Sequence, residues 1–369
     1  MSKFLNPIKP QVRALRAYAL APDRASVKIN QNENPWDVSA RIKEETQRRL
    51  SAREWSRYPD FAPASLCEQL AEFAGWMPDG IIAGNGSNEL IQALSMVTVG
   101  VGKRVLISEP TFALYRQIST VLGGEVISVP LTAQLSYDVE AFQAAVRDLK
   151  PDVTIICSPN NPTGCVLSDD DLCGLLERSD GLVVVDEAYH EFAEHSVVPL
   201  LQKHKNLVVL RTFSKAMSMA ALRVGYLLAA PELTREIGKA VLPYNLNAIS
   251  QTAAEVAIEM YQEELRPQVQ RIISERERLY GELSKVEGLT PLRSQGNFML
   301  VRWRIDPKRV FAELLTRDIL IRDVSTYPML SEYFRVSVGT PEENDLLLQA
   351  LGNVLERDGK RSATPWSAR

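Results

Sequence analysis

The length of the chain, 369 residues, suggests one large domain plus a smaller one, or two. With 45% apolar and 24% charged residues, its composition is typical of a soluble globular protein. Its net charge of −4 leaves no basic footprint that would favour nucleic acid or an anionic membrane as a partner. The 4 cysteines form no CxxC pair and the 3 histidines no zinc pattern, so we expect neither disulfides nor a metal site. Without an apolar stretch of signal-peptide or membrane-spanning length, the protein is expected in the cytoplasm.

Along the middle of the chain, short apolar runs alternate with segments of helical period. The predicted strands are 104–108, 125–129, 153–157, 182–186, 207–211 and 224–229, and the predicted helices are 88–97, 112–122 and 138–148. Strands without polar alternation, separated by helices, indicate an α/β fold with a mostly parallel sheet that is covered on both faces. Ligands bind such sheets beyond the carboxyl ends of the strands, so the loops that follow the strands are where a site is expected.

The pattern changes after about residue 245. Residues 250–285 form one long helical stretch in which Pro267 predicts a kink. Shorter apolar segments follow at 297–303 and 318–321, with a strand at 334–338 and helices at 307–317 and 341–356. We therefore predict an N-terminal arm over 1–30, a large domain over 31–245, a smaller α+β domain over 246–358 and a disordered tail over 359–369.

Two polar motifs stand at the edges of the predicted sheet. "GNGSNE" (84–89) opens a helix at Ser87, and the free N–H groups and positive dipole end there suit a phosphate, although an ordinary helix cap would have the same sequence. "SPNNPTG" (158–164) follows the strand 153–157 and has the composition of a turn. Its tandem amides, Asn160 and Asn161, could also donate hydrogen bonds into a crevice at the strand end.

Two further motifs bring ionisable groups to the same edge. Asp186 closes the apolar strand of "VVVDEAYHEF" (183–192), where a carboxylate is either a helix cap or a site residue. Lys215 follows strand 207–211 in "RTFSKAMSMAALRVGY", among small and apolar neighbours that are unusual for an exposed loop. A desolvated lysine has a lowered pKa and attacks aldehydes, and the guanidinium of Arg223 fits a phosphate or a carboxylate.

A phosphate cradle, an amide donor, a carboxylate and a reactive amine are together what pyridoxal 5′-phosphate requires. The series NPTG (161–164), D-x-x-Y (186–189) and S-K-x₇-R (214–223), each after a predicted strand, resembles the fold-type I pyridoxal-phosphate aminotransferases of classes I and II. The resemblance covers residues 25–356. The chain is most similar to the histidinol-phosphate aminotransferase group, on stretches that include "INQNENPWD" (29–37), "SRYPD" (56–60), "EPTFALY" (109–115), "LIRDV" (320–324) and "FRVSVGT" (334–340).

The resemblance implies a role for each matching residue. Lys215 would form the Schiff base, and Asp186 would face the pyridine nitrogen. Asn161 and Tyr189 would donate to the phenolate oxygen, and Phe112 would stack on the ring. The implied phosphate ligands are Ser87, Asn88, Ser214, Arg223 and, from the other subunit of a homodimer with shared active sites, Tyr58. The implied substrate residues are Arg335 for the α-carboxylate, Arg322 for a substrate phosphate, Asn34 and Tyr18.

The implied reaction is a ping-pong transamination between a small amino donor and a 2-oxo acid, in which Lys215 moves a proton between Cα and C4′. Histidinol phosphate and 2-oxoglutarate would give imidazole acetol phosphate and glutamate, a step of histidine biosynthesis. Four alternatives stay open: an aromatic or broad-specificity aminotransferase, a threonine-phosphate decarboxylase, a C–S lyase, and a pyridoxal-phosphate-binding sensor domain that is not an enzyme.

Overall fold

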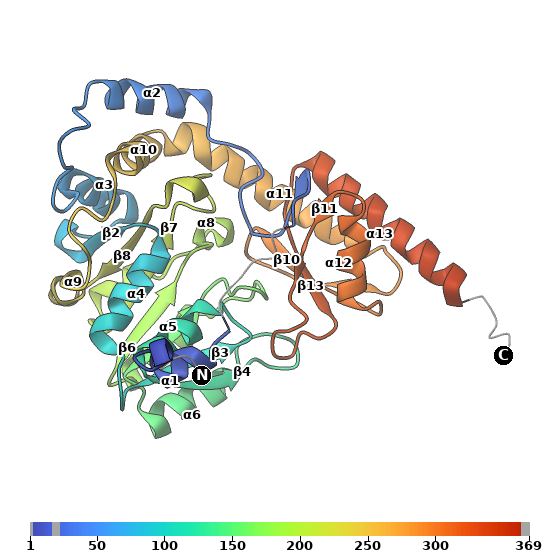
Figure 1. Cartoon of the computed structure of the whole chain (residues 1–369), viewed down its shortest axis with the longest axis horizontal. Coiled ribbons are helices and arrows are strands. Elements are labelled where there is room, and N and C mark those ends of the chain that lie inside the picture. Colours follow the sequence, from blue (N-terminus) through green and yellow to red (C-terminus); the bar gives the residue numbers. More distant parts are fainter. Residues whose placement is uncertain (1–2, 17–22, 363–369) are drawn as a thin grey trace.

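A computed structural model describes residues 3–16 and 23–362 as two lobes (Figure 1). The larger lobe contains a seven-stranded sheet in the order β2-β8-β7-β6-β5-β3-β4. Its strands are β2 (Ile81–Gly84), β3 (Arg104–Glu109), β4 (Glu125–Pro130), β5 (Val153–Cys157), β6 (Leu182–Asp186), β7 (Leu207–Thr212) and β8 (Gly225–Ala229). Only β8 runs antiparallel to its neighbours, so the sheet is mixed but mostly parallel and the predicted α/β class is confirmed.

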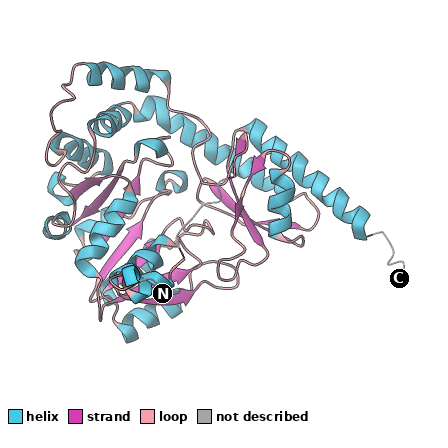
Figure 2. Ribbon diagram, in the orientation of Figure 1, coloured by secondary structure: helices cyan, strands magenta, loops and turns pink. Residues whose placement is uncertain are grey.

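Both faces of this sheet are buried, which explains the apolar runs. Along β6, Val183 and Val185 pack into one hydrophobic cluster, while Val184 packs into another on the opposite face. Helices cover the two faces (Figure 2). They include α4 (Ser87–Thr98), α5 (Leu114–Leu122), α6 (Val139–Leu149), α7 (Asp169–Arg178) and α9 (Pro231–Gly238). The carboxyl ends of the parallel strands thus meet at one edge, as expected.

The smaller lobe is built on an antiparallel sheet in the order β12-β13-β10-β9. Its strands are β9 (Leu289–Pro291), β10 (Phe298–Trp303), β12 (Arg322–Asp323) and β13 (Tyr333–Ser337), with helices α11 (Arg266–Leu283), α12 (Pro307–Leu315) and α13 (Pro341–Ser362) around them. Near the N-terminus, β1 (Val27–Lys28) pairs in parallel with β11 (Ile319–Leu320). Val27 and Ile29 belong to the core of the smaller lobe, so this part of the predicted arm packs there.

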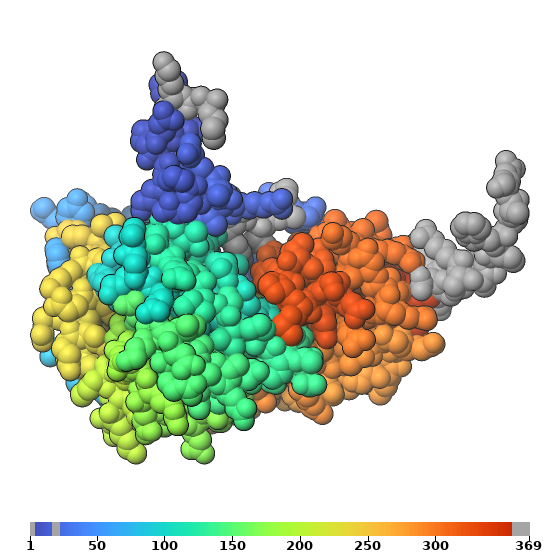
Figure 3. Space-filling view, turned by 90° about the horizontal axis from the view of Figure 1, so that it is seen from below, coloured from blue at the N-terminus to red at the C-terminus, as the bar shows by residue number. Residues whose placement is uncertain are grey.

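The remaining elements are short or lie at the periphery. The helices are α1 (Pro10–Ala14), α2 (Ala40–Ser51), α3 (Ala64–Ala74), α8 (His190–Ala193) and α10 (Ala248–Glu259), with 3-10 turns at Lys3–Leu5, Pro78–Gly80, Val198–Gln202 and Ala220–Leu222. Residues 3–16, in dark blue, stand out from the face of the larger lobe in Figure 3. Within the described residues, no helix is both long and apolar enough to span a bilayer.

Three features differ from the sequence prediction. The helical stretch 250–285 is interrupted by a π-helix at Tyr261–Leu265, and Pro267 sits in the first turn of α11, where its missing N–H costs no hydrogen bond. The preceding helix α10 packs into the core of the larger lobe, although it falls in the smaller domain predicted from residue 246. The last helix extends to Ser362, so it includes the start of the predicted disordered tail, whose residues 363–369 lie outside the described part of the chain.

Candidate active site

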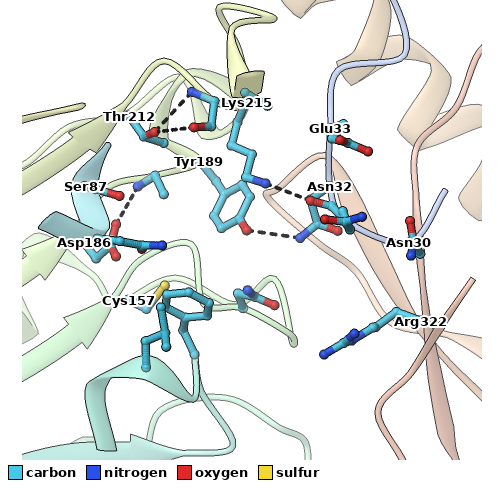
Figure 4. A pocket seen from close by; sticks show the side chains of 18 of the residues that line it. Asn30, Asn32, Glu33, Ser87, Cys157, Asp186, Tyr189, Thr212, Lys215 and Arg322 are labelled. Atoms are coloured by element: carbon cyan, nitrogen blue, oxygen red, sulfur yellow. Dashed lines mark hydrogen bonds between the residues drawn. The ribbon is translucent and has the colours of Figure 1, made fainter. Parts of the chain in front are cut away.

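A cavity of about 420 Å³ opens where the carboxyl ends of β5, β6 and β7 face the smaller lobe (Figure 4). The loops of the larger lobe line one wall of this cavity. Strands β12 and β13 and the segment 30–33 line the other wall. The lining residues that the sequence predicted are Ser87, Asn88, Phe112, Asn161, Asp186, Tyr189, Ser214, Lys215, Arg223, Arg322 and Arg335. The fold therefore gathers eleven of the predicted side chains around one space.

Lys215 reaches this cavity from the loop that follows β7. Its side chain is mostly buried, and its Nζ donates to the carbonyl of Gln31 at 2.8 Å. Desolvation, and then the positive charge of Arg335, lowers the pKa of Lys215 to about 7. A large share of the amine is therefore unprotonated at neutral pH, as a nucleophile or a general base requires.

Asp186 is the last residue of β6 and is only 3% exposed. Its Oδ1 accepts from the backbone N–H of Ala188 at 3.0 Å, and its Oδ2 accepts from Tyr115 Oη at 2.6 Å. Burial raises the pKa of Asp186 to about 6, while the Tyr115 hydrogen bond opposes that rise. Asp186 is not the cap of the next helix, α8 (His190–Ala193), whose N-cap is Tyr189. Its bond to Ala188 instead holds the turn after β6, and its carboxyl group lines the cavity.

Tyr115 is a site residue that the sequence did not reveal. It lies fully buried in α5, within the helical run predicted over 112–122, and there it looked like a core residue. Its ring also packs edge-to-face on Phe112, with 5.5 Å between the ring centroids. One buried phenol thus supports both the carboxylate and the aromatic wall of the cavity.

The two tandem amides have separate roles. Asn160 is fully buried and structural, because its Nδ2 donates to the carbonyl of Pro110 at 3.0 Å and to Thr163 at 2.9 Å. Asn161 lines the cavity and accepts a hydrogen bond from Arg335 through Oδ1. This contact leaves the Asn161 amide hydrogens for another acceptor.

One corner of the cavity is suited to a phosphate. Helix α4 begins there at Ser87, after Gly86 at a φ of 82°. A side chain at Gly86 would overlap the Arg223 guanidinium, so glycine allows the close approach. Arg223 in turn donates to Ser214 Oγ at 3.1 Å. A helix N-terminus, a hydroxyl and a guanidinium converge at this corner, which is the environment that a dianion prefers.

Two arginines line the opposite wall. Arg322 and Arg335 are register partners on β12 and β13, so their side chains leave the same face of the sheet. Arg335 is 7% exposed and donates to the carbonyl of Asn30 at 2.8 Å. Figure 4 shows Arg322 across the cavity from Asp186. Like charges directly opposite one another are unfavourable in a sheet unless an anion lies between them, so this wall suits a negatively charged ligand.

Two of the predicted residues that the structure describes do not line this cavity. Tyr58 is 81% exposed and stacks on Tyr244 with ring centroids 4.6 Å apart. Asn34 lines a neighbouring cavity and donates to the carbonyl of Ala216 at 3.3 Å. Tyr18 lies outside the described residues. Within the part of the chain that the structure describes, no group of three or more His, Cys, Asp and Glu side chains could hold a metal ion.

Comparisons with known proteins cover nearly the whole chain. The family model for aminotransferase class I and II matches residues 25–351. The chain is 38% identical to a histidinol-phosphate aminotransferase of Chlorobium phaeobacteroides, over 93% of this chain and 96% of that protein. It is 37% identical to one of Chlorobaculum tepidum, over 93% and 99%. A Sinorhizobium meliloti histidinol-phosphate aminotransferase, solved in complex with pyridoxal 5′-phosphate, has the same fold, with a TM-score of 0.86, 24% identity and coverage of 95% and 98%.

Proposed function

The chain belongs to the class I and II aminotransferase family, and we propose that it transfers the amino group of histidinol phosphate to 2-oxoglutarate. The products are imidazole acetol phosphate and glutamate. The relatives at 37% and 38% identity carry the name of this activity over nearly their full lengths. The structural observation that carries the proposal is the pair Arg322 and Arg335, which faces the Lys215 amine across one cavity.

Pyridoxal 5′-phosphate is the cofactor, and the chemistry of the cavity fits it. When bound, it supplies an aldehyde that condenses with amines and a ring that withdraws electrons from the carbon next to the nitrogen. Ser87, Asn88, Ser214 and Arg223 would hold its phosphate at the N-terminus of α4. Phe112 would cover one face of its ring, because Phe112 lines the cavity and its contact with Tyr115 fixes its plane.

The proton-handling groups follow from the charges around the cavity. Lys215, with its pKa near 7, is the group that would take the proton from the substrate Cα and deliver it to C4′. Asp186 would keep the ring nitrogen protonated, because a buried carboxylate stabilises a cation beside it. Tyr189 and Asn161 would donate hydrogen bonds to the ring oxygen. Lys215 would thus act as both base and acid, while Asp186, Tyr189 and Asn161 would supply the electrostatic stabilisation.

The wall with the two arginines must bind a phosphate in one substrate and a carboxylate in the other. Histidinol phosphate has a phosphate ester on the carbon next to its amine-bearing carbon, whereas glutamate and 2-oxoglutarate have a carboxylate at that position. Arg335 would bind the carboxylate, and Arg322 would add the second guanidinium that a phosphate uses. Asn34 and Tyr18 remain proposed substrate residues.

The test is a set of half-reactions followed through the absorption of the bound cofactor, without an acceptor. We expect histidinol phosphate to convert the cofactor with a higher kcat/KM than phenylalanine, and glutamate to convert it as well. Equal values for histidinol phosphate and phenylalanine would assign a broad aromatic aminotransferase. Release of CO₂ from threonine phosphate would instead assign a decarboxylase.

We also propose that the working unit is a homodimer with shared sites. A cluster of the aromatic rings of Tyr58, Phe61 and Tyr244 is exposed, and a second copy would cover it. In an isologous interface, each Tyr58 would reach the cofactor phosphate of the other chain.

Complementation tests this arrangement. Inactive Lys215→Ala chains are mixed with inactive Tyr58→Ala chains, and each heterodimer then has one site with both lesions and one site with neither. Partial recovery of activity is expected. No recovery despite confirmed chain exchange would reject shared sites.

A cytoplasmic location is proposed as well. The four thiols are free, and Cys67, Cys165 and Cys173 are partly accessible, which suits a reducing compartment. Fractionation of cells that express the chain at its natural level would test this location.

A further inference from the structure

Three consecutive residues of the segment that crosses between the lobes each bond one side chain of the site. The carbonyl of Asn30 accepts from Arg335 at 2.8 Å, and the carbonyl of Gln31 accepts from Lys215 at 2.8 Å. Asn32 is different, because it contributes its side chain: its Nδ2 donates to Tyr189 Oη at 3.1 Å (Figure 4). Asn32 is 1% exposed, so water cannot replace this contact.

The orientation of the Asn32 amide is determined by its other contacts. Ser337 Oγ accepts from the Asn32 backbone N–H at 2.8 Å and donates to Asn32 Oδ1 at 3.0 Å. With Oδ1 engaged by a hydroxyl, Nδ2 must face Tyr189. Asn297 Nδ2 donates to the Asn32 carbonyl at 3.0 Å and holds the backbone in place. In the opposite amide orientation, Nδ2 would face Ser337 Oγ, which already accepts from the Asn32 backbone N–H, and the Ser337 hydroxyl hydrogen would lose its acceptor Oδ1.

This arrangement decides the direction of the Tyr189 hydroxyl. A phenol oxygen that accepts from an amide must direct its own hydrogen elsewhere, and Tyr189 lines the cavity. The charged and titratable groups around Tyr189 are Asp186, Cys157, Arg335 and Lys215, whose Nζ lies 6.0 Å from the Tyr189 ring centroid. Within the described part of the chain, none of these four groups accepts a hydrogen bond from Tyr189 Oη, so the hydroxyl hydrogen is left for a ligand in the cavity.

We propose that Asn32 is a positioning residue that makes Tyr189 a hydrogen-bond donor toward the cofactor ring oxygen. The inference rests on the proposed function, because it needs pyridoxal 5′-phosphate in this cavity. It adds a residue from outside the strand-end motifs. It also links the electronic state of the cofactor to Ser337 in the smaller lobe, 305 positions along the chain.

Two substitutions of Asn32 distinguish its role in positioning Tyr189 from a role in packing alone. Asn32 has a φ of 53°, a conformation that glycine adopts freely and that asparagine and aspartate tolerate. Asn32→Gly therefore deletes the amide without backbone strain. Asn32→Asp keeps the volume but replaces the donor with an acceptor, so Tyr189 would donate to the new carboxylate and no longer to the cofactor. Asn206→Asp is the matched control, because Asn206 donates to the carbonyl of Leu176 far from the cavity.

The readout is the pH midpoint of the absorption change of the bound cofactor, without substrate, in the wild-type and Tyr189→Phe backgrounds. A donor to the ring oxygen stabilises the deprotonated form, so its loss raises the midpoint. Asn32→Gly should raise it by about half a unit and Asn32→Asp by about one unit or more. In the Tyr189→Phe background, Asn32→Gly should leave the midpoint unchanged. Asn32→Asp should shift the midpoint there only by the smaller effect of its charge.

Each result decides whether Asn32 positions the Tyr189 hydroxyl or is only structural. Equal shifts in both backgrounds, or no shift in either, would overturn the inference and leave Asn32 as a structural residue. If Asn32→Gly fails to fold, the isosteric Asn32→Asp decides by the same comparison. Failure of the wild-type protein to bind pyridoxal 5′-phosphate would instead reject the proposed function, and the two failures are therefore distinguishable.

Discussion

The two walls of the cavity are built in different ways. On the wall of the larger lobe, Asp186, Asn161 and Lys215 lie within a few residues of a strand end, and neighbouring parallel strands bring them together. On the other wall, Asn32 meets Ser337, and the Asn30 carbonyl meets Arg335, each across 305 positions of sequence. The first wall, proposed to hold the cofactor (the cofactor wall), is thus a property of one sheet. The second wall, proposed to bind the substrate (the substrate wall), exists only when the two ends of the chain pack together.

The largest expected effect lies on the cofactor wall, at Lys215. Lys215→Met should lower turnover by about 10⁴-fold or more, because both the covalent partner and the general base are lost. Borohydride reduction of the wild-type enzyme with its cofactor should label this lysine. A label on another lysine would contradict the assignment.

The same substitution should make the cofactor-free protein more stable. The folded-state pKa of Lys215 is lowered to about 7, so folding loses stability as the pH falls from the unfolded value toward 7. Removing the amine should therefore raise the free energy of unfolding by on the order of 2–4 kcal/mol at pH 7, and by less than about 1 kcal/mol at pH 10. Denaturant unfolding at the two pH values measures the difference, and an equal gain at both would argue against a desolvated amine.

Asp186 is the second site on the same wall. Asp186→Ala should still bind some cofactor through the phosphate corner, but the rate of proton removal from Cα should fall by about 10²- to 10³-fold. Exchange of the substrate α-hydrogen with solvent measures this step. Near-normal exchange would leave Asp186 with only its bond to Ala188.

Arg322 tests the substrate wall. Arg322→Ala should raise KM for histidinol phosphate by the equivalent of about 1.5–3 kcal/mol, the contribution of a charge-assisted hydrogen bond, and should change KM for phenylalanine much less. The control is Arg302→Ala on β10, an exposed arginine that pairs with Glu332 at 3.1 Å. Similar losses for both substrates would mean that this wall is not built for a phosphate.

The smallest expected effect is at Tyr115, which supports the cofactor wall from behind. Burial raises the folded-state pKa of Asp186 to about 6, so this residue stabilises the fold most at low pH and loses that contribution as the pH rises through 6. Tyr115→Phe removes a donor that the ionised carboxylate needs more than the protonated one. The cofactor-free variant should lose about 1–2 kcal/mol of stability at pH 8 and clearly less at pH 5. An equal loss at both pH values would show that Tyr115 acts only through packing.

The sequence by itself determined most of the cofactor wall. The strands from 104 to 229 are found within a residue or two of their predicted ends, because strands of a sheet that is covered on both faces have continuous apolar runs. Short strands escaped detection: β2, β9 and β12 have four residues or fewer, too few for a periodic pattern. The pattern of α10 likewise marks a helix but does not say which core the helix joins.

Only the tertiary structure decided which polar residues share the cavity and which way they face. Asn160 and Asn161 are adjacent and chemically identical, yet one is buried in turn contacts and the other faces Arg335. Tyr115 looked like part of an apolar helix face until its hydroxyl was seen against Asp186. The donor direction of Tyr189 depends on Asn32 and Ser337, residues from opposite ends of the chain. Local sequence specifies strands and turns through short-range sterics and burial, but a hydrogen-bond direction depends on every partner in space, and those partners meet only when the chain has folded.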